Sequence, residues 1–155
     1  MTERSATHAT FTIERSYPVP PARVFAAFAD GDAKGIWMDD PDFKSDGETE
    51  YEMDFRVGGH ERFGNTYQGV TYTYDALYYD IVPDERLVYS YEMYADGVRL
   101  SVSVATIEFA KTDDVTTLTW TEQGAYLDGI DGEDAARLRE GGTSEMLDGL
   151  TKYLA

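Results

Sequence analysis

Apolar and polar side chains alternate along most of this chain, which is the pattern of strands with one buried face. In 10–17, for example, Phe11 and Ile13 alternate with polar residues. Further alternating stretches, separated by turn signals such as Asp96-Gly97, predict strands at 51–57, 60–67, 70–82, 87–93, 100–109 and 117–122. Within 70–82 and within 100–109 the apolar parity changes, which predicts a bulge near Asp75-Ala76 and a second switch before Ile107. Because short turns join consecutive strands, we expect an antiparallel meander.

Two short helices are predicted after the first strand. Pro21 suits the first turn of a helix, and Val24 and Phe28 then lie on one apolar face. A second short helix is expected at 32–38, and the polar, acidic stretch 39–50 that follows predicts a loop. This loop lacks the alternating ligands, glycine and closing glutamate of a calcium site.

One long helix is predicted at 133–154. Its apolar residues recur at three- and four-residue steps: Leu138, Met146, Leu147, Leu150 and Leu154. Gly141-Gly142 predicts a kink or a break, because each glycine costs about 1 kcal/mol relative to alanine inside a helix. Alternatively, the missing side chains leave room for a ligand. A single amphipathic helix must bury its stripe against the sheet, so the fold class is α+β, with a curved antiparallel sheet of about seven strands around this helix.

The length of 155 residues fits one domain, which we place at 10–155 behind a short disordered lead-in at 1–9. The chain has no apolar run of 18 residues, and its first residues lack the apolar core of a signal peptide. We therefore expect no membrane association and a cytoplasmic location.

Charge and composition narrow the function classes. The chain has 30 acidic and 13 basic residues and a formal net charge of −17, which repels nucleic acid and anionic membranes. A solvated acidic surface is the simplest interpretation, with a salt-adapted source or a docking face for a basic partner as alternatives. The absence of cysteine excludes disulfides and thiolate chemistry. The 12 Tyr, 7 Phe and 2 Trp predict an aromatic-lined interior.

Glu122 is the most informative ionisable residue. It shares the parity of Leu118 and Trp120, so it is expected either to point into the interior with a raised pKa or to lie solvated at the rim. An inward Glu122 is the one candidate for acid/base catalysis. The two histidines, His8 and His60, are too few and too far apart for a usual zinc site, and we expect no metal and no cofactor.

Several segments resemble a known family in their order and spacing. They are 20–28, Trp37, 54–59, 82–89, 117–119 and 146–150. The chain resembles the helix-grip fold of the START and birch-pollen-allergen (SRPBCC) superfamily, and more narrowly the domain related to the activator of the heat-shock protein 90 ATPase. The resemblance spans 11–154 and implies a deep hydrophobic cavity between sheet and long helix, used by different members for lipids, polyketides or hormones. Many relatives have Gly-Trp where this chain has Gly142-Thr143, which implies a larger cavity here.

This resemblance and the patterns above define the expected site. The expected cavity residues are Phe28, Trp37, Phe55, Tyr79, Tyr91, Trp120, Glu122, Gly142, Met146 and Leu150. We expect a monomer or homodimer that binds a small apolar or aromatic molecule and is not an enzyme. One alternative is an acid/base enzyme of cyclase or hydratase type in the same cavity, and another is a chaperone-associated or stress-related protein-binding module.

Overall fold

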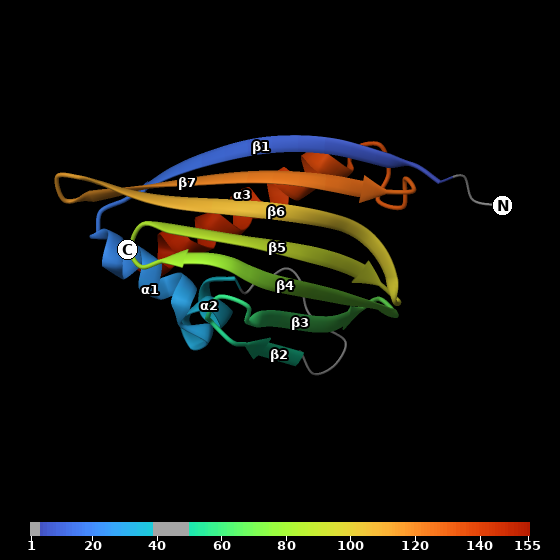
Figure 1. The fold of residues 1–155 in the computed structure, drawn as a ribbon, viewed down its shortest axis with the longest axis horizontal. Coiled ribbons are helices and arrows are strands. Elements are labelled where there is room, and N and C mark those ends of the chain that lie inside the picture. The colour runs from blue at the N-terminus through green and yellow to red at the C-terminus, as the bar shows by residue number, and fades with distance from the viewer. Residues whose placement is uncertain (1–3, 39–49) are drawn as a thin grey trace.

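The computed structural model describes residues 4–38 and 50–155, and the loop predicted at 39–50 falls almost wholly outside them. The elements are β1 (Ala6–Tyr17), α1 (Pro21–Ala29), α2 (Gly31–Trp37), β2 (Glu50–Met53), β3 (His60–Tyr67), β4 (Val70–Val82), β5 (Arg86–Ala95), β6 (Val98–Thr112), β7 (Val115–Leu127) and α3 (Ala135–Leu154). The strands form one antiparallel sheet in the order β1-β7-β6-β5-β4-β3-β2. This sheet curves in front of α3, and α1 and α2 lie near the C-terminal end of α3 (Figure 1). The predicted α+β helix-grip architecture is confirmed.

α3 holds the fold together by burying one stripe. Leu147, Leu150 and Leu154 recur at helical spacing and are all buried in the core between α3 and the sheet. Leu138, expected on the same stripe, is 63% exposed, which corrects that assignment. It lies near the start of α3, where the stripe no longer meets the core.

The glycines of α3 differ in how closely other parts of the chain approach them. α3 continues through Gly141 and Gly142, so the predicted break is wrong: burial of the leucine stripe farther along outweighs the helix propensity of two glycines. A Cβ at either position would meet no atom within 4 Å. At Gly149, in contrast, a Cβ would overlap the carbonyl oxygen of Trp37, so glycine there lets α2 approach α3.

Two strand boundaries differ from the prediction. β1 begins at Ala6, because the backbone from Ala6 onward pairs with β7, so the predicted lead-in is wrong for 6–9. β2 ends at Met53, because the chain then turns: the backbone N–H of Arg56 donates to the carbonyl of Asp54 at 3.0 Å. Phe55 therefore lies in a loop rather than in a strand.

The predicted bulge of β4 is displaced along the strand. Ala76 and Tyr78 are both buried, so the alternation holds through Tyr78, and the register shifts between Tyr78 and Asp80. Tyr79 lies within this irregularity and is 57% exposed. The prediction that Tyr79 faces the cavity is therefore wrong, because a shift of one residue reverses the face that each side chain occupies.

The buried face of β6 also differs from the prediction. Ser101 and Ser103 are buried, whereas Val102 and Val104 are exposed on the other face of the sheet. The register shift lies at the start of β6, opposite Met93 of β5, and not before Ile107. β-branched residues are favourable on the outer face of a sheet, so valines do not identify the buried face.

Candidate functional site

A cavity of ≈ 420 Å³ lies between α3 and the sheet. Helices α2 and α3, strands β4, β5 and β7, and the loop before α3 all contribute side chains to it. The lining residues are Lys34, Trp37, Met38, Tyr74, Tyr89, Tyr91, Met93, Trp120, Asp131, Ala135, Leu138, Arg139, Gly142, Thr143 and Met146. Most are aromatic or aliphatic, so the cavity is largely apolar with a few charged groups.

Half of the residues expected in the cavity line it. These are Trp37, Tyr91, Trp120, Gly142 and Met146. Gly142 is exposed, and a Cβ there would meet no atom within 4 Å.

The other expected residues lie elsewhere. Phe28 is buried behind the lining, with ring centroids 5.0 Å from Trp37. Phe55 packs edge-on against Tyr78 at 5.1 Å, and Leu150 is fully buried in the core. Phe28 and Leu150 belong to the core and Phe55 packs against it, and none of the three forms the cavity surface.

Glu122 points inward, in agreement with its parity, and is 1% exposed. Its Oε2 accepts a hydrogen bond from the Tyr91 hydroxyl at 2.7 Å, and its Oε1 accepts one from Trp120 Nε1 at 3.3 Å. Burial raises the pKa of this carboxyl, opposed by the Tyr91 hydrogen bond and the charge of Arg139. Glu122 does not itself line the cavity, whereas its two hydrogen-bond donors, Tyr91 and Trp120, do.

Arg139 is a functional candidate that the sequence analysis missed. Its Nη1 donates to the Tyr91 hydroxyl at 2.9 Å and to Ser103 Oγ at 3.5 Å, and its Nη2 donates to Ser101 Oγ at 2.9 Å. The guanidinium also lies 5.4 Å from the ring centroids of Tyr91 and Tyr126. The buried serines of β6 therefore hold an arginine of α3 against the cavity.

A second polar cluster, also missed, reaches the cavity through Lys34 of α2. Lys34 Nζ donates to Glu61 Oε1 at 2.8 Å, and both side chains are almost fully buried. The hydroxyls of Tyr51, Tyr74 and Tyr78 also donate to Glu61, at 2.6, 3.4 and 3.3 Å. Glu61 is thus saturated with donors, as a buried carboxylate requires.

Comparison with known proteins places this architecture in a family. The sequence profile described as Activator of Hsp90 ATPase homolog 1-like protein matches residues 18–155. The chain belongs to this family. A search of curated proteins finds no match.

Solved structures resemble this family member over its whole length. An uncharacterised protein from Rhizobium leguminosarum is 40% identical, with a TM-score of 0.88, covering 99% of this chain and 98% of that one. The Mll3558 protein from Rhizobium loti is 45% identical, with a TM-score of 0.87, covering 97% of this chain and 99% of that one. CalU16 from Micromonospora echinospora is 19% identical, with a TM-score of 0.63, covering 100% of this chain and 87% of that one, and shares the fold. Within the described part of this family member, no helix has the length and apolar character needed to cross a membrane.

The raised pKa of Glu122 has a consequence for the stability of this family member. A raised pKa means that the folded state holds the proton more tightly than the unfolded state, whose carboxyl titrates near its ordinary value of 4.5. The contribution of this carboxyl to the stability of the folded state is therefore complete below pH 4.5 and is lost as the pH rises through the folded-state pKa of Glu122. Urea unfolding at a series of pH values from 4.5 upward should show wild type losing stability relative to Glu122→Gln, by no more than about 1.4 kcal/mol per pH unit. The exposed Glu14→Gln variant is the control, and a pH-independent difference for Glu122→Gln would contradict the assignment.

Proposed function

We propose that this protein binds a small apolar or aromatic molecule in the cavity between α3 and the sheet. The observation that carries this proposal is the cavity itself, whose volume of ≈ 420 Å³ lies within the range of about 300–1,000 Å³ common for small-molecule sites. Its lining combines a large aromatic surface with a small number of polar groups, the composition expected of such sites.

The aromatic lining favours a flat ligand. Tyr74 and Tyr91 lie with ring centroids 5.1 Å apart, and Tyr89 meets Trp120 edge-on at 6.3 Å. These rings are held in place by packing and hydrogen bonds, so they offer apolar area without much further loss of side-chain entropy on binding. The methionines of the lining, Met93 among them, can adapt to the outline of a ligand.

The position of Glu122 favours ligand binding over the alternative function of an acid/base enzyme. A proton-transfer group must come within hydrogen-bond reach of the substrate, and both oxygens of Glu122 are engaged by Tyr91 and Trp120. The chaperone-associated alternative draws on the net charge and the family description, and no contact of the described residues adds to either.

Filling the cavity tests the proposal. Gly142 lines the cavity, and its missing side chain faces open space, so Gly142→Trp should fold normally while its indole occupies ligand volume. Titration with the neutral dye Nile red should show saturable fluorescence enhancement with wild type. The variant should bind the dye about tenfold more weakly or worse.

Gly141→Trp is the matched control. Gly141 is the preceding residue of the same helix and, like Gly142, is exposed, but only Gly142 lines the cavity. Both substitutions remove a helical glycine and add an indole, so they differ only in where that indole points. Equal dye affinity for the two variants, or no dye binding by folded wild type, would refute the proposal.

A further inference from the structure

The cavity presents two cations with different electrostatic surroundings. Lys34 and Arg139 both line it. The ammonium of Lys34 is met directly by the Glu61 carboxylate at 2.8 Å, so its charge is largely balanced within the protein. The carboxylate nearest to Arg139 among the described residues is Glu122, with 4.0 Å between Nη1 and Oε2.

Neutral groups hold the Arg139 guanidinium. Its three hydrogen bonds go to the hydroxyls of Tyr91, Ser101 and Ser103, and the Tyr91 hydroxyl stands between Arg139 and Glu122. The 4.0 Å between Nη1 and the nearest Glu122 oxygen is longer than a hydrogen bond, so Glu122 balances the charge of Arg139 less directly than Glu61 balances that of Lys34. Arg139 is therefore a charge fixed in geometry but only weakly neutralised.

Donors also remain on Arg139. A guanidinium has five N–H groups, and the three hydrogen bonds leave two without an acceptor among the described residues. No buried side-chain nitrogen or oxygen among those residues lacks a partner, so the Nε of Arg139 is accessible to solvent. The side chain is 16% exposed, which is enough to receive a ligand atom and little enough to keep the charge poorly hydrated.

We propose that the ligand is a planar aromatic molecule carrying one carboxylate, with the carboxylate bound to Arg139 and the ring against Tyr91 and Trp120. This inference rests on the proposed binding function and adds the charge class of the ligand. A guanidinium matches the planar, two-oxygen geometry of a carboxylate. Tyr91 lies beneath the guanidinium and also lines the cavity, so a ligand bound at Arg139 has an aromatic face beside it.

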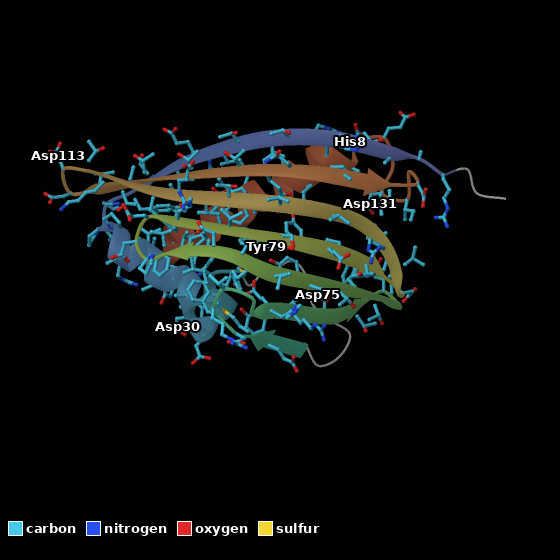
Figure 2. All side chains as sticks on the ribbon, viewed as in Figure 1. His8, Asp30, Asp75, Tyr79, Asp113 and Asp131 are labelled. Carbon is cyan, nitrogen blue, oxygen red and sulfur yellow. The ribbon has the colours of Figure 1, made fainter. Side chains whose placement is uncertain are left out.

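Besides Glu122, two sets of negative charge oppose this binding. Asp131 lines the cavity from the loop between β7 and α3 (Figure 2), but it is exposed, so water screens its effect. The net charge of −17 repels anions at long range, yet at physiological salt this repulsion decays over about 8 Å. Arg139, in direct contact with the ligand and mostly buried, dominates at the site.

The test compares an acid with its neutral counterpart. Isothermal titration of wild type with naphthoate and with naphthamide, which share one ring system, should show naphthoate binding about 10- to 100-fold more tightly, the ratio expected for hydrogen bonds to a charged group. Arg139→Met should abolish this preference, so that the ratio of the two affinities falls to about one whatever the variant does to binding of the neutral compound. Arg139→Lys should keep part of the preference, because it retains the charge but loses the planar fork.

Arg137→Met is the control for charge. Arg137 lies on the same helix, is exposed, and pairs with Asp134 at 3.1 Å outside the cavity lining. It should keep the wild-type preference. If wild type binds the two compounds equally, or if Arg137→Met loses the preference as fully as Arg139→Met, the carboxylate inference is overturned while the binding function stands. If folded wild type binds neither compound nor Nile red, the proposed function itself fails.

Discussion

Replacing Lys34 with methionine should lower the free energy of unfolding by about 3–5 kcal/mol, the cost of removing one partner of a buried ion pair. Methionine keeps most of the apolar stem, so the main change is the loss of the ammonium that donates to Glu61 at 2.8 Å. Glu61 is 1% exposed and would remain as a buried carboxylate held by neutral hydroxyls alone. Chemical denaturation of the ligand-free protein measures this effect.

A second substitution separates the uncompensated charge from lost packing. Glu61→Gln in the Lys34→Met background removes the charge and keeps a carbonyl oxygen that the tyrosine hydroxyls can bond. We expect the double variant to recover more than half of the lost stability, because the isolated charge is the main cost. Surface substitutions usually change stability by no more than about 0.5 kcal/mol. A Lys34→Met variant within this range of wild type would contradict the prediction, because it would show that water hydrates the Glu61 carboxylate once the ammonium is gone.

The fold could be predicted from the sequence because its determinants are local and periodic. Alternation in β1, β5 and β7 and the leucine spacing of α3 identify the buried faces without any tertiary information. Glu122 could be placed by the same means, since its parity on β7 matches that of Leu118 and Trp120.

The predictions were wrong where the tertiary structure determines which face of a strand is buried. Val102 and Val104 suggest a buried face of β6, but the buried positions are Ser101 and Ser103, which accept hydrogen bonds from Arg139. Hydropathy alone predicts that the valines are buried and the serines exposed. The opposite holds because a serine is stable in the interior once a hydrogen-bond donor is present.

The sequence indicates the sites of Arg139 and Lys34 less clearly than that of Glu122. Arg139 lies four residues before Thr143 and seven before Met146, so it shares the cavity face of α3, but an arginine at such a position is usually solvated. Glu61 has the parity of Phe63 on β3, the same kind of signal that singled out Glu122. Its partner Lys34 is 27 positions away on α2, and no short-range pattern joins the two.

Leu150→Ala should be among the most destabilising single substitutions in α3, at about 2–5 kcal/mol. Leu150 is completely buried and belongs to the core between α3 and the sheet. Removing its side chain leaves a void that the close packing there closes only in part, because Gly149 beside it already brings α2 into contact with α3.

Leu138→Ala provides the matched control for this effect. It makes the same chemical change in the same helix, but at a position that is 63% exposed, so its stability should stay within about 0.5 kcal/mol of wild type. Urea unfolding of both variants, without ligand because Leu138 touches the cavity, measures the difference. Equal losses at the two positions would mean that helix propensity, and not burial against the sheet, determines what each leucine contributes. A loss confined to Leu150 would identify the contact between helix and sheet as the source of the stability that keeps the cavity open.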